Sequence, residues 1–397
     1  MPHPDGTQTY IRAAESTENI PSSRRVRDVA KRILYLDPDA APLTLVLAKA
    51  RTRVVTNSKY EWMEKDLPAR WDAINNGAGY SDAATDVVVD NGDKFLVGDV
   101  VNIVRTGEKV RVTAVDTATE TLTIVRSVGS TAAAAIIDND ALQIIGNSQS
   151  EGGTSPTPKS HQETYPFNYT QIVKTAFEVT GTESVSENYT GPDRPRLRAE
   201  KAIEHKIDLE RTAIFGEREI DTSSTNNPIR YTGGFLFYAD ENVKDFGGTL
   251  TEPEMETWSE DLFHHTAGSD TRLLLSAATP ISVINQLAVA RIQMVPKEKT
   301  FGLSISQWIT AHGTFLIAKH RLLENSPVGD TTQGYGGYML ALEPSRLAYC
   351  PLRERNTKLL VDVQANDQDT MKDMYMTECG WALENPRLHG VGKNITA

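Results

Sequence analysis

A run of short, closely spaced strands between residues 90 and 146 constrains the fold more than any other feature of the sequence. Four apolar segments separated by polar turns are predicted to be strands, at residues 100–104, 110–115, 122–125 and 141–145. Strands this short at such close spacing are typical of a small β-barrel or sandwich. The flanking segments 51–65 and 165–179 have the composition of extended chain, and 147–160 is a connector rich in glycine, serine and proline. This order predicts a β module at about 90–146 inserted into a long β-hairpin.

A long helix is the second constraint, and it is predicted over residues 196–215. Good helix formers fill this segment. Asp193 stands at the N-cap position, Pro195 lies in the first turn, and Gly216 follows where a C-terminal cap belongs. One apolar stripe is expected along the helix, formed by Ala199, Ile203, Ile207 and Ile214. A helix with one narrow apolar face should lie on a sheet or on a neighbouring subunit.

The C-terminal half alternates helices and strands without a regular βαβ repeat, which indicates an α+β fold class. Thr251 and Glu254 form a capping box for one helix, which is expected to end at Gly268, and Pro280 begins another. Later strands are predicted at residues 272–276, 315–319, 338–342, 347–350, 359–364 and 374–381.

Residues 1–50 are expected to form an N-terminal arm, because their first part is polar and cannot offset its own ordering entropy. A short amphipathic helix is predicted within this arm, at residues 23–36. Its basic run from Arg24 to Arg32 is interpreted as a solvated or intersubunit salt-bridge face. The sequence shows no signal-peptide pattern and no apolar run that could span a membrane, so no membrane partner is expected.

The overall charge limits the partners that the chain is expected to bind. It has 41 Lys and Arg against 53 Asp and Glu, a formal net charge of −12. Such a chain is repelled by a phosphate backbone, so any contact with DNA is expected to be non-specific. Cys350 and Cys379 lack the spacing of a metal site and are expected to be ordinary reduced residues.

Motifs for catalysis or phosphate binding are incomplete in this sequence. Residues 302–306, GLSIS, lack the second glycine of a nucleophile elbow, so Ser304 is not expected to be a nucleophile. The glycine cluster at 334–338 has no following helix and no nearby lysine, and is interpreted as a flexible loop. Between 96 and 146 there is no Trp, Tyr or Phe, which disfavours stacking on a sugar ring.

Titratable side chains are plentiful but are not arranged as an active site. Glu200, Glu204 and Asp208 stack on the long helix and are interpreted as a solvated face, with Glu210 placed to pair with Lys206. The histidines are interpreted as surface or packing residues: His264, His265, His312 and His320. The sequence therefore predicts no catalytic residue, no cofactor-binding site and no metal site, and the protein is not expected to be an enzyme.

The order of these pieces resembles the Hong Kong 97-like capsid fold of tailed phages. More specifically, it resembles a branch of tailed-phage major capsid proteins that carry a β module inside the extended loop. The resemblance rests on four sequence segments: FLVGDVVNIVRTGEKVRVTAVD at 95–116, LTIVRSVGSTAAAAI at 122–136, AEKAIEHKIDLERTAIFG at 199–216 and ECGWALENPRLHGVG at 378–392. The likeness spans most of the chain and rests on order and pattern.

The resemblance implies a division of the chain into the parts of that fold. Residues 1–50 would be the N-terminal arm and 51–175 the extended loop with its β module. The peripheral domain would comprise 176–232 and 346–397, with its spine helix at 196–215. The axial domain would be 233–345. Glycine pairs and clusters at 233–234, 247–248 and 334–337 are expected to act as hinges.

The implied function is that of a major capsid protein. It would self-assemble as hexamers and pentamers into the icosahedral head of a tailed double-stranded DNA phage, and would be part of the virion after assembly in the host cytoplasm. Portal, scaffolding and decoration proteins are the further partners implied. Two alternatives stay open at this point: an encapsulin-like compartment shell, and a hydrolase with an appended β-binding module.

Overall fold

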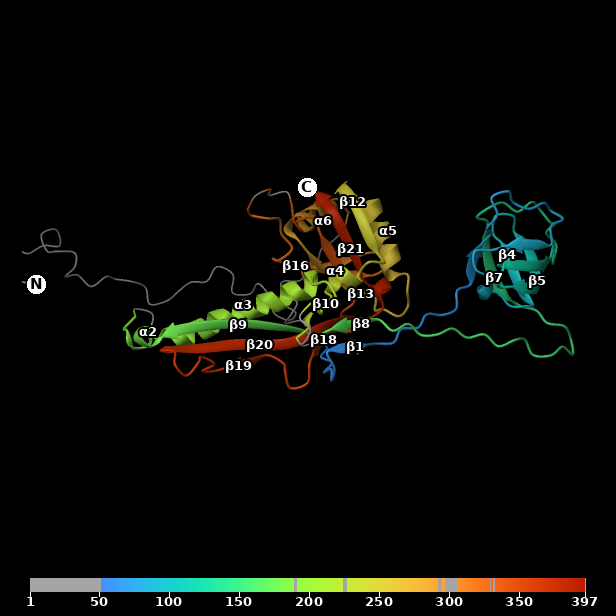
Figure 1. Ribbon diagram of the computed structural model, residues 1–397. Coiled ribbons are helices and arrows are strands. Elements are labelled where there is room, and N and C mark those ends of the chain that lie inside the picture. Colours follow the sequence, from blue (N-terminus) through green and yellow to red (C-terminus); the bar gives the residue numbers. More distant parts are fainter. Residues whose placement is uncertain are drawn as a thin grey trace, which may run out of the picture. The chain divides into compact units, whose positions relative to one another are not determined.

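The computed structural model describes residues 51–188, 191–223, 227–291, 295–296, 306–328, 330 and 333–396 (Figure 1). The chain divides into two compact units, of which the second is Trp62–Pro166 and the first contains the residues before and after it. The predicted arm with its helix and basic run lies outside the described residues. So do residues 302–305 of the GLSIS segment.

The second unit is built on a six-stranded antiparallel sheet in the order β2-β7-β4-β5-β6-β3. Its strands are β2 (Trp71–Ala73), β3 (Asp86–Val88), β4 (Asp99–Ile103), β5 (Glu108–Asp116), β6 (Thr121–Val125) and β7 (Ala141–Asn147), with the short η2 (Gly92–Lys94) between β3 and β4. A bridge between Ile74 and Val89 joins the two edge strands, so the sheet closes into a barrel. The four strands predicted between residues 100 and 145 are confirmed.

Aliphatic side chains that point inward from these strands fill the barrel. The buried set is Ile74, Val87, Val89, Phe95, Val101, Ile103, Val110, Val112, Leu122, Ile124, Ile136, Leu142 and Ile144. The barrel sheet begins at Trp71, earlier than the predicted start of the module near residue 90. Strands β2 and β3 are only three residues long, too short to show the alternation by which strands are recognised.

A seven-stranded mixed sheet dominates the C-terminal half of the first unit, in the order β12-β21-β17-β13-β16-β15-β14. The strands are β12 (Val243–Thr249), β13 (Thr271–Ser276), β14 (Val295–Pro296), β15 (Ser306–Ile309), β16 (Thr314–Lys319), β17 (Met339–Leu342) and β21 (Gly390–Thr396). β13 runs parallel to β16 and antiparallel to β17. Helices α5 (Glu252–Phe263) and α6 (Ala278–Arg291) pack against this sheet.

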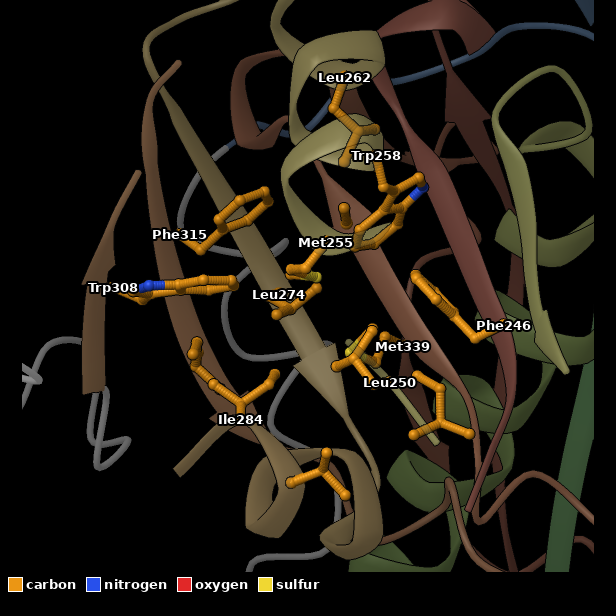
Figure 2. Packing of buried hydrophobic residues seen from close by; sticks show 14 residues of the cluster. Phe246, Leu250, Met255, Trp258, Leu262, Leu274, Ile284, Trp308, Phe315 and Met339 are labelled. Carbon is orange, nitrogen blue, oxygen red and sulfur yellow. The ribbon is translucent and has the colours of Figure 1, made fainter. Parts of the chain in front are cut away.

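The core of this sheet is aromatic and aliphatic. Figure 2 shows Trp258 and Leu262 of α5 beside Leu274 of β13 and Phe315 of β16. The Trp258 and Phe315 rings are stacked, with centroids 6.3 Å apart and planes 5° from parallel. Because every member of this cluster is buried, the interlocked side chains fix the helices on the sheet.

The first unit also contains a second sheet, in which the long strand β20 (Thr370–Leu383) has partners on both sides. One side pairs with β18 (Leu347–Pro351) and β19 (Lys358–Leu360), and the other with β9 (Gln171–Thr180). Helix α3 (Asp193–Phe215) lies along β9 and β20 (Figure 1). The smaller elements are β1 (Lys59–Glu61), β8 (Phe167–Tyr169), β10 (Glu219–Asp221), β11 (Ile229–Tyr231), α2 (Gly181–Val185), α4 (Phe235–Tyr238), η3 (Pro344–Arg346) and η4 (Pro386–Leu388).

The ends of α3 differ from the prediction. The helix begins at Asp193, with Pro192 as N-cap, and the Asp193 side chain pairs with Arg196 at 2.7 Å instead of capping. Gly216 has a φ of −61° and a ψ of 142°, which is not the left-handed cap conformation. A Cβ there would lie 2.4 Å from the Thr232 carbonyl oxygen, so close backbone approach is the reason for glycine.

The buried face of α3 also differs from the predicted stripe. Of the four apolar residues expected on it, Ile214 is buried but Ala199 is exposed. The buried face is formed by His205, Leu209, Glu210, Ala213 and Ile214. The hydrophobic pattern missed this face because two of its members are polar residues whose partners come from distant strands.

The caps of α5 follow the sequence more closely. The predicted capping box is present, and the Glu254 carboxylate accepts the Thr251 backbone N–H at 3.1 Å. The helix ends at Phe263, five positions before the Gly268 that was expected to end it. At Gly268 a Cβ would meet the Arg272 guanidinium, so this glycine makes room for a buried cation and not for a helix cap.

Two arginines of α3 anchor the helix to β20 through one buried carboxylate. Arg194 contacts both oxygens of Asp373, at 2.6 and 2.9 Å, and Arg198 contacts one of them at 2.9 Å. The Asp373 side chain is fully buried. Hydrogen bonds from Arg194 hold the pKa of Asp373 at about 2, well below its usual range.

Replacement of Leu274 by alanine tests the sheet core. Leu274 is fully buried, so Leu274→Ala removes apolar contacts and leaves a cavity. We expect a loss of about 2–5 kcal/mol in the free energy of unfolding of the unassembled chain, measured by urea denaturation. Val243→Ala on β12, where the side chain is 44% exposed, is the control and should change stability by less than about 1 kcal/mol.

The Asp373 anchor predicts a specific acid sensitivity. Because the folded-state pKa is depressed, the contribution of Asp373 is present above about pH 4 and is lost as the pH falls through about 2. The depression corresponds to roughly 2 kcal/mol, which Asp373→Asn should remove. We expect the stability difference between wild type and Asp373→Asn to shrink over that pH range, whereas Asp240→Asn, an exposed control, should match wild type throughout. A difference that stays constant with pH would contradict the assignment.

Candidate functional site

No group of three or more His, Cys, Asp or Glu side chains in the described part of the chain is placed to hold a metal ion. His264 and His265 lie side by side, with ring centroids 5.2 Å apart and planes 86° apart. His312 lies 3.3 Å from the Glu256 carboxylate, and both side chains are partly exposed. These residues are placed as ordinary surface side chains.

His320 is buried and bonded to the long helix. Its Nε2 lies 2.8 Å from the Glu210 carboxylate, and both side chains are fully buried. The Leu322 backbone N–H donates to Nδ1 at 3.3 Å, so the ring proton is on Nε2 and is donated to Glu210. The predicted pairing of Glu210 with Lys206 is therefore wrong: the carboxylate faces inward and joins α3 to the end of β16.

The other carboxylates of α3 have partners on their own helix. Glu200 pairs with Arg196 at 2.9 Å, and Glu204 with Lys201 at 2.6 Å. Such partly exposed pairs stabilise a helix only slightly. Their geometry matches the predicted solvated face and does not bring two carboxylates together for acid–base chemistry.

A buried ion pair joins the ends of two neighbouring strands of the seven-stranded sheet. Arg272 of β13 and Glu343, which follows β17, are in direct contact, and each side chain is 1% exposed. Glu343 also accepts the Ser269 N–H at 3.0 Å and the Ser345 hydroxyl at 2.8 Å, while Arg272 Nε donates to the Leu388 carbonyl at 3.0 Å. Nearby, burial lowers the pKa of His389 to about 4. All these groups are satisfied internally, which indicates a structural role.

The glycine cluster at 334–338 and the Gly247–Gly248 pair both line a hollow of about 640 Å³. Among the described residues that line the hollow there is no lysine or arginine to attract a phosphate. Gly337 packs so closely on Ile395 that a Cβ would lie 2.5 Å from its carbonyl oxygen. Gly247 and Gly248 have positive φ at a register shift in β12. Two of the three predicted hinges thus line one neutral cavity.

The third predicted hinge, Gly233–Gly234, is held in place. The Asn168 side chain accepts the Gly233 N–H at 2.8 Å and donates to the Gly233 carbonyl at 2.9 Å. A Cβ on Gly234 would lie 2.8 Å from the Ala213 carbonyl oxygen. Close packing against the end of α3 accounts for glycine at these positions.

In the first unit, an unpaired strand edge could form backbone hydrogen bonds with a strand of another chain. β9 pairs with β20 on one side, and no strand of the described residues pairs with its other edge. Its side chains alternate, and Ile172 is 46% exposed. Such an edge presents unpaired N–H and C=O groups to a neighbour. The segment that follows residue 50 already makes parallel bridges here, from Thr52 to Tyr349 of β18 and from Val55 to Leu352 just after that strand.

The extended segments of the second unit leave apolar side chains in solvent. Leu67 is 91% exposed, Met63 71% and Tyr165 56%. The two segments pair through a bridge between Glu64 and Thr164. Extended chain with exposed apolar residues gains stability when another surface covers it.

The two cysteines are buried thiols, and the helices that the structure describes include no candidate membrane span. Cys350 and Cys379 are free and buried, as expected of reduced residues, and burial raises the pKa of both thiols to about 12. Within the part of the chain that the structure describes, no helix is both long and apolar enough to cross a bilayer.

Comparison with known proteins gives a match over almost the whole chain. The family model described as SU10 major capsid protein matches residues 6–396. The chain is also 23% identical over 315 residues to the major capsid protein of Pseudomonas phage PaMx41, covering 76% of this chain and 74% of that protein.

Solved structures of similar shape include capsid and compartment proteins. The capsid of a native GTA particle has a TM-score of 0.48 at 9% identity and covers 97% of this chain and 100% of its own. The SrpI encapsulin complex from Synechococcus elongatus has a TM-score of 0.42 at 13% identity and covers 59% and 76%. The assignment rests on the family match and not on these likenesses. The predicted resemblance to tailed-phage major capsid proteins is confirmed, and the chain belongs to the SU10 major capsid protein family.

Proposed function

We propose that this chain assembles as hexamers and pentamers into the icosahedral head of a tailed phage and encloses its double-stranded DNA genome. The observation that carries the proposal is the match to a major capsid protein family over residues 6–396, which includes both compact units. As a member of that family the protein is a structural protein of the virion and not an enzyme.

The parts of the fold have proposed roles in the shell. The seven-stranded sheet with α5 and α6 would form the axial domain, within the expected 233–345 and completed by β21 from the chain end. Helix α3 with β9, β18, β19 and β20 would form the peripheral domain, in which α3 is the spine helix. The second unit would be the extended loop with its barrel module. The exposed apolar side chains of its extended segments support a role in contacts between copies.

Further partners are proposed from the requirements of a phage head. A shell of this kind needs a portal for DNA entry and a scaffold that sets its curvature, and decoration proteins would bind its outer surface. The net charge of −12 supports only non-specific contact with packaged DNA, because an acidic protein surface repels a phosphate backbone. Assembly would take place in the host cytoplasm.

The phage head is better supported than the two alternatives. The family model and the curated relative are both major capsid proteins, and the relative is that of a phage. A hydrolase would require a set of catalytic side chains, and the described histidines and carboxylates that were candidates are occupied in structural pairs or lie on the surface.

Expression of the full chain alone tests the assembly function. We expect closed shells or capsomer rings in negative-stain electron microscopy, and a size-exclusion peak far above the mass of the 43.7 kDa chain. Scaffold protein is to be co-expressed if the chain alone gives only capsomers. A stable monomer under both conditions, with hydrolytic turnover of an ester or glycoside, would falsify the proposal.

Removal of residues 1–50 tests the proposed role of the arm. The described core clusters of the two units consist of residues after 73, so we expect the far-ultraviolet circular dichroism and the thermal unfolding midpoint of the unassembled chain to stay close to wild type. Shell yield should fall at least tenfold, because the proposed arm would gain stability by contact with neighbouring copies. Equal shell yields from both chains would show that the arm is dispensable for assembly.

A further inference from the structure

The second unit contains a hollow of about 370 Å³ between its extended segments and one end of its barrel. The incoming segment contributes Arg70, the outgoing segment Lys159, and β4 and β7 contribute Asp99 and Asn147. Lys94, from η2, completes the charged lining. Three cations and one carboxylate from separate parts of the sequence therefore meet around one space in a chain that is acidic overall.

Two of these four charges are already satisfied. Asp99 accepts the Leu96 backbone N–H at 2.8 Å, and Lys94 forms an ion pair with the buried Asp72 at 2.7 Å. Arg70 and Lys159 are different. Neither side chain makes a hydrogen bond or an ion pair with any residue that the structure describes. The hollow thus has two cationic side chains whose donors point to no partner within this part of the chain.

The electrostatics of Lys159 agree with this geometry. Lys159 as a whole is exposed, but partial desolvation in the hollow lowers the pKa of its ammonium group. The attraction of Asp99 and Asp93 raises this pKa, but by less than desolvation lowers it. The positive charge of Arg70 adds to the lowering. Two cations that repel each other beside a partly desolvated space are stabilised when an anion binds between them.

We propose that this hollow is an oxyanion-binding site, in which Arg70 and Lys159 hold the anion and the Asn147 amide supplies a neutral donor. A guanidinium presents two parallel N–H groups that match two oxygens of one carboxylate or phosphate, and a lysine ammonium adds a compact charge. The volume admits an anion of that size together with water.

The oxyanion has two possible sources with the same chemistry. One is free phosphate, and the other is an aspartate or glutamate side chain of a neighbouring copy in the shell. The second source rests on the proposed assembly function, and the 53 acidic residues of each copy make such a carboxylate available. In that case the site would tie the extended loop of one copy to the next by a salt bridge.

The first arm of the test measures phosphate binding to the unassembled full chain. The variants are Arg70→Gln, Lys159→Gln and the double variant, with Arg111→Gln on β5 as a control that removes one charge from the same barrel outside the hollow. In inorganic phosphate, compared with chloride at equal ionic strength, a bound anion should raise the unfolding midpoint of wild type and Arg111→Gln by roughly 4 °C or more. The double variant should show no rise, while its circular dichroism and its midpoint in chloride match wild type.

The second arm measures assembled particles of the same four variants and wild type. If a neighbouring carboxylate is the ligand, particles of the double variant should dissociate at a clearly lower urea concentration than those of wild type or Arg111→Gln in buffer without phosphate. A phosphate effect that the double variant loses, with no difference in stability between the assembled particles, identifies a free oxyanion instead. The proposal is overturned if neither arm separates the double variant from the control, and the capsid function then still stands because particles form. If no variant and no wild-type chain assembles, the assembly function fails and the first arm alone decides this site.

Discussion

The pairing of β9 with β20 is the interaction on which the rest of the first unit depends. It aligns residues 171–180 with residues 370–379 in one antiparallel ribbon, so the strand after the extended loop is completed by a strand near the chain end. Helix α3 lies on this ribbon, and His205 fixes it there by hydrogen bonds to Thr175 of β9 at 2.9 Å and Thr377 of β20 at 2.7 Å. Without the ribbon, the buried His205 of α3 would lose both of its hydrogen-bond partners and would carry a desolvation cost.

In the first unit, the two ends of the inserted module are held together by a pair of short strands. β1 and β8 pair antiparallel at the two points where the chain leaves and re-enters the first unit. Tyr60 of β1 is buried and donates to the Trp381 carbonyl of β20 at 2.8 Å, and the Asn168 amide of β8 donates to the same carbonyl at 2.7 Å. Because the ends of the insertion are held together in the first unit, the barrel can close on its own core.

Local patterns in the sequence predicted the long elements well and the long-range chemistry poorly. Strand β13 and the capping box of α5 follow from neighbouring residues, and so does most of α3. The three-residue strands β2 and β3 carry no periodic signal and were missed. Arg272 within an apolar strand was the one visible hint of its buried partner Glu343, since a charge there requires one. No local pattern in the sequence predicts that Arg70 and Lys159 line the same hollow, because their proximity depends on how the barrel closes.

The distribution of satisfied and unsatisfied groups fits a subunit that folds first and assembles afterwards. In the described residues the deeply buried charges have partners in the same chain, as for Asp373, Glu210 and the Arg272–Glu343 pair, so folding requires no neighbour. The groups without a partner among the described residues are of three kinds. They are the free edge of β9, the exposed apolar residues of the extended segments, and the two cations of the hollow. Each can be completed at little structural cost by a surface that arrives later. Assembly can then be driven by many weak contacts on a preformed fold, which lets copies exchange until the shell closes.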